Sequence, residues 1–482
     1  MGTAPRPGPA ILAAALPMFM ASLNNLVVTN SLPLIGRDMA ASETNLQWVV
    51  NGYVLAFAGL MLTGAALGDR FGRRRVFLWG IGVFALGSIA CALSPVVFLL
   101  IPARVLQGVG AAAMLPLSLT LVTASVPAER RGAAIGLWGG VNGLGVALGP
   151  LVGGLVANLF SWQGIFYINV AVALVAVPLL LRFVPESRGR DSELDLLGMV
   201  LVTAAVVFLV LAIVRTSREG WTSGHVLVLF ACVVVLLVLF LVWERRAPHP
   251  LLPLRFYRNR AFVLSNIVSL TMFFGMFGAI FLMTQYLQGP LDLSALAAGV
   301  WTLPWTASPM LLAPVAGMVA GRLGTGRLMA AGLAVQAGAL AWLALVADVY
   351  VPYSRIVAAL ALAGIGMGLV LAPNALAVFG SVADDEHGKA SGANNTLREI
   401  GGALGVAVST SVFSARFNGV RVRTPLQGFQ LFVHGMTTAL WVSVAVLAAG
   451  AVAALCIPHV RDGRRAGRSE AASRADELVR SS

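Results

Sequence analysis

Acidic side chains are scarce in the apolar stretches of this chain, and Glu399 is the candidate for proton chemistry among them. It stands beside Arg398 in the segment SGANNTLREIGGALGVAV, residues 391–408. A carboxyl group can take up and release a proton, and an ionisable group at membrane depth usually faces a bundle interior or a cavity. Adjacent residues on a helix do not face each other, so we expect Arg398 and Glu399 to have separate partners. A purely structural role near the end of its apolar stretch remains an equal alternative for Glu399.

A second polar group lies in another apolar stretch, where Arg104 stands about one turn inside and precedes Gln107 on the same helical face. This pair could bind substrate or couple transport, or Arg104 could extend its guanidinium to the outer surface. In the first apolar stretch, Asn24 and Asn25 cannot titrate, but their amides can bind a substrate or join neighbouring helices. Further residues that could line a cavity are Asn51, Tyr53, Asn142, Gln285, Tyr286, Trp301, Trp305, Gln336 and Asn374.

A third pattern concentrates charge in the short segment GAALGDRFGRRR, residues 64–75, which we call the latch segment. Its glycines allow a sharp reversal, and an acid there can accept hydrogen bonds from a helix N-terminus or from arginine. The segment resembles the loop signature of major facilitator proteins, which implies a polar latch between helices, with Glu129 of the next loop on that side as an ionic partner. The alternative is that the arginines only orient the chain in a membrane. The residues assigned to the latch are Gly64, Gly68, Asp69, Arg70, Gly72, Arg73 and Glu129.

A fourth pattern is the run VNGLGVALGPLVGGLV, residues 141–156. Proline removes a backbone hydrogen bond from a helix, and glycines at spacings of three and four bare one helix face for close packing. The run therefore predicts a bent helix with a tightly packed face that serves as a pivot between moving parts. An ordinary packing helix is the alternative. The pivot residues are Gly145, Gly149, Pro150, Gly153 and Gly154.

The composition assigns these patterns to a membrane protein. Hydrophobic residues make up 58% of the 482 residues and charged residues 11%, and the mean hydropathy is +0.87. A soluble domain carries about a quarter charged residues. The formal net charge of +13 lies largely between apolar stretches, which fits membrane orientation and does not call for a nucleic-acid partner. No phosphate-binding loop and no metal-ligand or nucleophile constellation occurs in the sequence, so we expect neither an enzyme nor an ATP-driven pump.

Fourteen apolar stretches are long enough to cross a bilayer. Basic residues favour the loops on one side together with the C-terminal tail, which places both termini in the cytoplasm. The predicted spans are 10–33, 47–68, 76–94, 97–122, 133–156, 163–183, 196–214, 224–243, 262–286, 298–320, 328–347, 354–379, 395–416 and 431–457.

An internal sequence repeat divides these spans into two halves. The latch segment joins the second and third spans, and a similar Gly/Arg segment at 317–328 joins the tenth and eleventh, without the acid. Parallel halves with a site at their interface are a transporter pattern. We therefore predict a six-helix bundle over 1–183, an inserted, peripheral and lipid-facing pair of helices with linkers over 184–261, a second six-helix bundle over 262–457, and a disordered cytoplasmic tail over 458–482.

The chain resembles the fourteen-helix drug:proton antiporters of the major facilitator superfamily. The resemblance rests on the latch segment, on Arg104 with Gln107, on the motif at 145–154, on the span count and on the segment around Glu399. The comparable first helix of those antiporters commonly has Asp where this chain has Asn24, so proton coupling must use another group.

The resemblance implies a monomer in a bacterial plasma membrane that exports amphiphilic drugs or antibiotics by alternating access, with the proton gradient and no cofactor as its energy source. An exporter of an endogenous metabolite and a facilitator without proton coupling remain open, as does a non-transporting membrane sensor.

Overall fold

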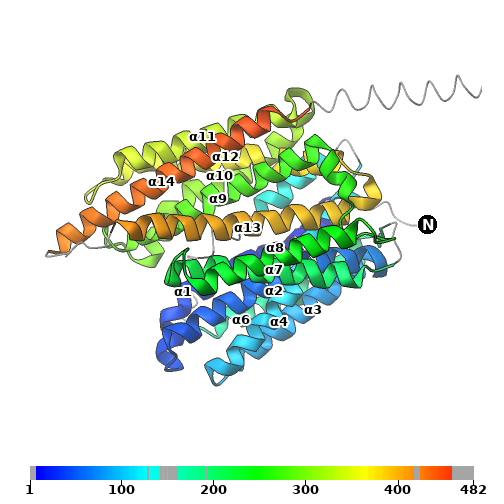
Figure 1. Cartoon of the computed structure of the whole chain (residues 1–482), viewed down its shortest axis with the longest axis horizontal. Helices are drawn as coiled ribbons and strands as arrows, with labels where there is room; N and C mark the ends of the chain where they lie inside the picture. The colour runs from blue at the N-terminus through cyan, green and yellow to red at the C-terminus, as the bar shows by residue number, and fades with distance from the viewer. Residues whose placement is uncertain are drawn as a thin grey trace, which may run out of the picture.

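The computed structural model describes residues 7–127, 130–141, Gly145, Gly149, 161–189, 193–416 and 424–458. Long helices run side by side along one common direction (Figure 1). The first group comprises α1 (Pro7–Asp38), α2 (Glu43–Phe71), α3 (Arg73–Ala92), α4 (Val97–Ala124), helical residues 131–141, and α6 (Gly164–Phe183). An intermediate pair, α7 (Leu196–Glu219) and α8 (Gly224–Glu244), follows. The last group comprises α9 (Arg260–Gln288), α10 (Ala295–Leu323), α11 (Thr325–Val346), α12 (Tyr353–Gly380), α13 (His387–Ala415) and α14 (Pro425–Leu455), with 3₁₀ turns η2 (Leu254–Arg258) and η3 (Asp384–Glu386).

Each of the fourteen predicted spans has a helix in the described part of the chain. Eleven of those helices are long and apolar enough to cross a membrane. Helix α13 falls below this apolarity because asparagines, Arg398 and Glu399 interrupt its sequence. These polar residues have an environment other than lipid, since most of them are buried against other helices.

The internal repeat in the sequence corresponds to the same backbone feature in both halves, a single glycine with positive φ between two helices. Gly72 separates α2 from α3 with a φ of 107°, and Gly324 separates α10 from α11 with a φ of 89°. Only glycine adopts such angles without strain, so each glycine allows two long helices to follow each other with a single residue between them.

Helices pack mainly within two groups. In the first group, α4 contacts α1, α2 and α3, and α6 contacts α1 and α3; in the last group, α9 contacts α13 and α14, and α12 contacts α10 and α11. The groups meet where α13 contacts α2 and α4. We call the end of the bundle at which α1 begins and α14 ends the terminal end; it lies at the right of Figure 1.

The two inserted helices, both expected to be peripheral, differ in their contacts. Many α8 side chains are exposed, whereas α7 packs against α2, α8 and α13 and so touches both groups. The hydroxyls of Thr203 on α7 and Thr63 on α2 lie 3.3 Å apart, and the indole of Trp221, just after α7, donates to Ser411 of α13. The Val/Leu/Ala composition of both helices concealed this difference, because an apolar side chain packs equally well against lipid and against protein.

Candidate functional site

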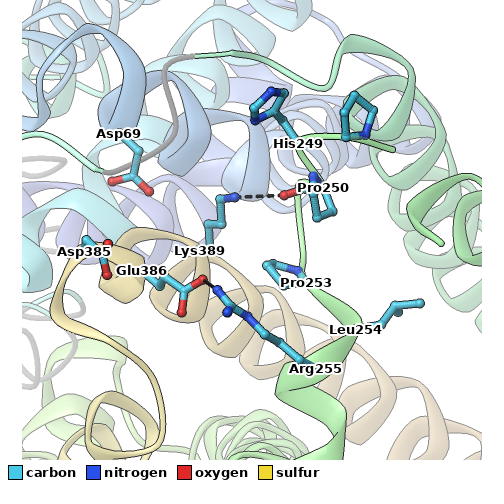
Figure 2. A pocket seen from close by; sticks show the side chains of 10 residues that line it. Asp69, His249, Pro250, Pro253, Leu254, Arg255, Asp385, Glu386 and Lys389 are labelled. Atoms are coloured by element: carbon cyan, nitrogen blue, oxygen red, sulfur yellow. Dashed lines mark hydrogen bonds and ion pairs between the residues drawn. The ribbon is translucent and has the colours of Figure 1, made fainter. Parts of the chain in front are cut away.

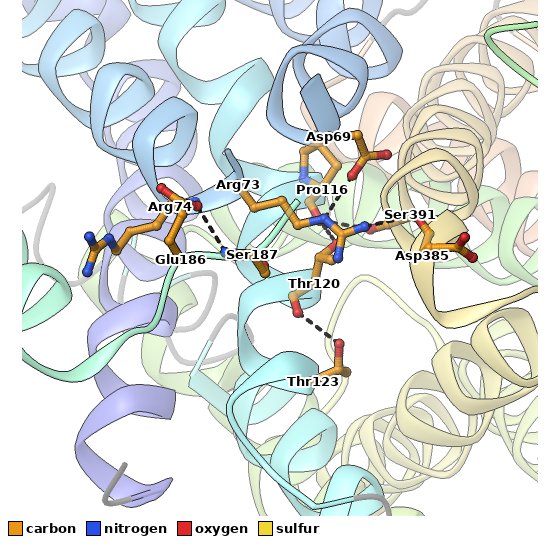
Figure 3. A network of polar contacts seen from close by, with 10 residues as sticks. All are labelled: Asp69, Arg73, Arg74, Pro116, Thr120, Thr123, Glu186, Ser187, Asp385 and Ser391. Carbon is orange, nitrogen blue, oxygen red and sulfur yellow. Dashed lines mark hydrogen bonds and ion pairs between the residues drawn. The ribbon is translucent and has the colours of Figure 1, made fainter. Parts of the chain in front are cut away.

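The acid of the latch segment is buried at the terminal end. Nε of Arg73 donates to Oδ1 of Asp69 at 2.8 Å, and both side chains are about 5% exposed. Nη2 of Arg73 donates to the backbone carbonyl of Asp385, which belongs to the last group of helices, at 3.2 Å. Figure 3 shows this arrangement, with Asp69 and Arg73 facing Asp385 and Ser391. The latch therefore joins the two groups through Arg73.

Two further polar contacts close the same end. The hydroxyl of Ser391 on α13 donates to the carbonyl of Pro116 on α4 at 3.1 Å. Arg131 and Asp384 form an ion pair at 3.1 Å between the start of helix 131–141 and η3. The hydrogen bond from Arg131 holds the pKa of Asp384 below its usual range. All of these contacts must break if the two groups separate at the terminal end.

Asp69 also faces the N-terminus of α13. A Cβ added at Gly388, the second residue of α13, would lie 2.7 Å from the carboxyl carbon of Asp69, so only glycine allows this approach. The N-terminus of a helix carries a partial positive charge that favours an adjacent carboxylate. Asp69 thus has an electrostatic attraction to the opposite group in addition to its pair with Arg73.

Other latch residues have roles that differ from the prediction. Gly64 packs against the backbone of α4 and Gly68 against Leu117, so both serve packing within the first group. Arg70 is exposed and lies over the ring of Phe71. Glu129 lies outside the described residues.

Glu186, in the linker after α6, is an acidic partner that the sequence analysis missed. Its carboxylate accepts hydrogen bonds from the backbone N–H groups of Arg74 at 2.9 Å and Arg75 at 3.2 Å, the exposed amides at the start of α3. This is side-chain capping of a helix, supplied from a distant part of the sequence. No local spacing could identify Glu186, because the capping residue is more than 100 positions away.

The linker between α8 and α9 covers the start of α13. Nζ of Lys389 donates to the carbonyl of Pro250 at 2.8 Å, and Arg255 pairs with Glu386 (Figure 2). Between the linker and the latch lies a cavity of about 590 Å³. Next to it, His387 is buried and stacks on Phe379, and burial lowers the pKa of His387 to about 4, so its imidazole is neutral at neutral pH.

Glycines hold the two groups together alongside the latch. A Cβ at Gly132 would overlap the backbone of Gly317 on α10, and one at Gly140 would lie 3.0 Å from Cα of Met310. Gly136 meets Pro314 in the same way. The helix that the sequence analysis singled out as a pivot therefore packs against the opposite group through Gly132, Gly136 and Gly140, which precede the predicted motif.

Of that predicted motif, Gly145 is buried and lies against α1, since a Cβ there would lie 2.7 Å from the carbonyl of Phe19. Gly149 is buried. Pro150, Gly153 and Gly154 lie outside the described residues.

Arg104 is fully buried, so the interpretation that it extends to the surface is wrong. Its Nε donates to the carbonyl of Val49 at 3.1 Å, another nitrogen donates to Oε1 of Gln107 at 2.7 Å, and the guanidinium lies 4.4 Å from the ring centroid of Tyr53. Gln107 in turn donates to Ser88 at 2.7 Å. The pair ties α4 to α2 and α3, one aromatic ring away from the central cavity described below.

Asn24 joins two helices of the first group. Nδ2 of Asn169 on α6 donates to its Oδ1 at 2.9 Å, and Asn24 is fully buried. The described geometry favours the interhelical role over substrate contact. The side chain of Asn25 and all of Asn142 lie outside the described residues.

A central cavity of about 140 Å³ lies between the two groups. It is lined by Met18, Ala21, Ser22, Tyr53, Phe57, Leu115, Trp138, Gly139, Phe273, Met276, Phe277, Met367, Leu371, Asn395, Arg398 and Glu399. Ligand pockets usually measure about 300–1,000 Å³, so the groups are drawn together around this cavity. Both groups contribute walls, which is the geometry that a site between rocking halves requires.

Glu399 lies deeper than the sequence predicted. Helix α13 begins at His387 and has 29 residues, so Glu399 stands near its middle, whereas a span starting at residue 395 placed it near one end. The polar run 387–394 concealed the true start, because those residues are buried by protein rather than exposed at a membrane surface.

Arg398 and Glu399 line the same cavity and interact electrostatically, and Arg398 has further partners. Arg398 is held by Asn374 and Asn395, each at 3.4 Å, and its guanidinium lies 5.4 Å from the ring centroid of Phe273. Asn374 also accepts from Ser269 and donates to the carbonyl of Ser265, so α9, α12 and α13 share one polar network. Among the described residues, the carboxylate of Glu399 makes no hydrogen bond and faces the cavity.

Comparison with known proteins identifies the family. Residues 14–406 match the sequence profile of the Major Facilitator Superfamily. The chain belongs to this superfamily. It is therefore a multi-pass membrane transporter with a major facilitator fold, and not an enzyme.

Relatives of this major facilitator protein include resistance proteins. It is 36% identical over 407 residues to the "Multidrug resistance protein Stp" of Mycobacterium tuberculosis, covering 84% of this chain and 75% of that protein. It is 33% identical over 418 residues to the "Tetracenomycin C resistance and export protein" of Streptomyces glaucescens, covering 86% and 77%. The crystal structure of the human organic anion transporter MFSD10 superimposes with a TM-score of 0.64 at 14% identity, covering 93% of this chain and all of that one, which supports the fold.

Proposed function

We propose that this protein exports small amphiphilic molecules by alternating access and that Glu399 takes up and releases the coupling proton. The observation that carries the proposal is the position of Glu399: it lies mid-helix, in a cavity walled by both groups, and makes no hydrogen bond among the described residues. A carboxyl group so placed can exchange its proton when the cavity changes its access. The neighbouring Arg398 donates a hydrogen bond to Asn395.

The names of relatives and the charge distribution support outward transport. One relative is named for export and another for multidrug resistance. Arginines gather in the latch segment and in the loops and tail of the same side, which supports placing the terminal end in the cytoplasm. The structure then represents the conformer closed toward the cytoplasm, from which substrate leaves outward.

The coupling residue differs from the one that the resemblance to drug:proton antiporters suggests. Asn24 stands where those proteins commonly have an acid, and its amide is bonded to Asn169. Since an amide does not titrate, coupling in this chain depends on Glu399. Asp69 is engaged with Arg73 at the terminal end, away from the cavity.

The proposal is tested in everted membrane vesicles from a host deficient in its own drug pumps. A panel of amphiphilic drugs is first screened for resistance, and uptake of the best substrate into vesicles is then followed with and without a protonophore. We expect accumulation that collapses when the proton gradient is removed. Accumulation against a gradient that persists without a proton motive force would contradict proton antiport, and equilibration without accumulation would identify a facilitator.

A further inference from the structure

A second cavity, of about 380 Å³, reaches Glu399 from the side. We call it the side groove. It lies between α2, α7, α9 and α13, and Val210, Ile213 and Val214 of the inserted helix α7 form one wall. Phe277 and Glu399 line both the side groove and the central cavity, so the two cavities meet at these residues.

The inserted helix gives the side groove a fixed wall. Helix α7 packs against α2 and α13, the two helices at which the groups meet. A Cβ at Gly59 of α2 would lie 2.6 Å from a methyl group of Val207, so α7 and α2 are in close contact. Together with the Thr63–Thr203 contact, this holds α7 in place over the seam between the groups.

The size and chemistry of the side groove suit a ligand. Its volume falls within the usual range of about 300–1,000 Å³, whereas that of the central cavity does not. Its walls are mostly aliphatic and aromatic, with Gln47 and Asn51 as uncharged polar groups. Glu399 is its one ionisable lining residue, while Arg398 lines only the central cavity.

We propose that the side groove is a second ligand site, in which the apolar body of a singly charged lipophilic cation lies between α7 and α13 while its charge pairs with the carboxylate of Glu399. A carboxylate in an apolar site favours a cation and disfavours an anion or a neutral molecule of the same shape. The aromatic rings of Phe277 and Phe281 add a surface that attracts cationic ligands. The proposal rests on the proposed function, because the ligand is taken to be a transported substrate that shares Glu399 with the proton.

Binding of radiolabelled tetraphenylphosphonium to the purified full-length protein in nanodiscs tests the site at pH 8. Val214→Trp fills the groove from α7, and Val200→Trp is the matched control, since Val200 lies on the same helix, is 64% exposed and does not line the groove. We expect Val214→Trp to weaken binding by about tenfold or more, because overfilling a packed site expels a ligand, and Val200→Trp to leave it unchanged. Glu399→Gln should weaken binding by about tenfold as well.

A second variant covers the case in which Val214→Trp does not fold. Phe281 is 39% exposed and lines the side groove but not the central cavity, so Phe281→Ala should fold and weaken binding by about threefold or more.

Unchanged binding in both Val214→Trp and Phe281→Ala would overturn the side groove as a site. The proposal would also be overturned if no tetraphenylphosphonium binding is measurable and lipid co-purifies with the protein. The groove would then hold a lipid acyl chain. The drug panel in vesicles separates this outcome from failure of the proposed function: a wild-type protein that exports drugs but fails the binding test refutes only the groove.

Discussion

The contact between Gly132 and Gly317 offers a way to change the conformational equilibrium without touching the cavity. A Cβ added at Gly317 would lie 2.7 Å from the carbonyl carbon of Gly132. Carbon atoms at optimal separation lie about 3.5–4.0 Å apart, so helix 131–141 and α10 must separate by about 1 Å to accommodate Gly317→Ala. In the proposed transport cycle this contact breaks when the terminal end opens, so we expect the substitution to destabilise the closed conformer.

The expected size of the effect follows from the cost of overpacking. An extra methyl in a tightly packed interface costs about 1–3 kcal/mol. A change of that size shifts a two-state equilibrium about 5- to 150-fold toward the conformer that is open at the terminal end. Substrate binding from that side should strengthen and turnover should fall, because the closed conformer becomes harder to reach.

Distances between spin labels measure this shift directly. Labels on exposed residues Arg130 and Ala383 report whether the terminal end is closed, and Gly321→Ala is the control, since a Cβ at Gly321 meets nothing within 4 Å. We expect a longer distance population in Gly317→Ala and none in Gly321→Ala. An identical distance distribution in both variants would refute the idea that this glycine contact stabilises the closed state.

Three further predictions concern charged and polar groups. Asp69→Ala should abolish transport while leaving membrane insertion intact, because it removes both the Arg73 pair and the carboxylate facing α13; normal transport would refute the latch. The Arg131–Asp384 ion pair should be fully present above the ordinary pKa of Asp and should be lost only as the pH falls through the lowered pKa of Asp384. Because the Asp384 side chain is 74% exposed, Asp384→Asn should lower the free energy of unfolding by less than about 1 kcal/mol in a thermal unfolding assay. A larger loss would contradict this prediction. Asn24→Asp should keep the hydrogen bond from Asn169 and leave proton coupling unchanged, because Asn24 does not line the central cavity; a gain of drug efflux would show that the missing acid limits coupling.

Much of the fold could be predicted because membrane spans are encoded locally. Length and apolarity predict each helix, and glycine at positions 72 and 324 marks two of the sharpest reversals. Whether a helix face is buried depends on the sequence of the helix that packs against it as well as on its own sequence. The start of α13 was not predicted, because its residues are polar. The contacts of α7 with both groups were not predicted either, because its residues are uniformly apolar.

The site was predicted in part for the same reason. Asp69, Arg73, Arg104 and Glu399 are unusual within their own segments, so sequence alone singles them out. Their partners are ordinary residues that only the fold brings close, such as Glu186, the carbonyl of Asp385 and the carbonyl of Val49. The glycines 132, 136 and 140 did carry a signal, a repeat at spacing four, which the more conspicuous Gly/Pro run after them obscured.

Proton movement during transport by Glu399→Gln tests the central claim most directly. Purified wild-type protein and the variant are reconstituted into liposomes that contain a pH-sensitive dye, and an imposed substrate gradient drives flux; Asp384→Asn serves as a control acid outside the cavity. The account predicts substrate-driven proton counterflow in the wild type and in Asp384→Asn, and downhill substrate flux without proton movement in Glu399→Gln. Proton counterflow at the wild-type ratio in Glu399→Gln would contradict it.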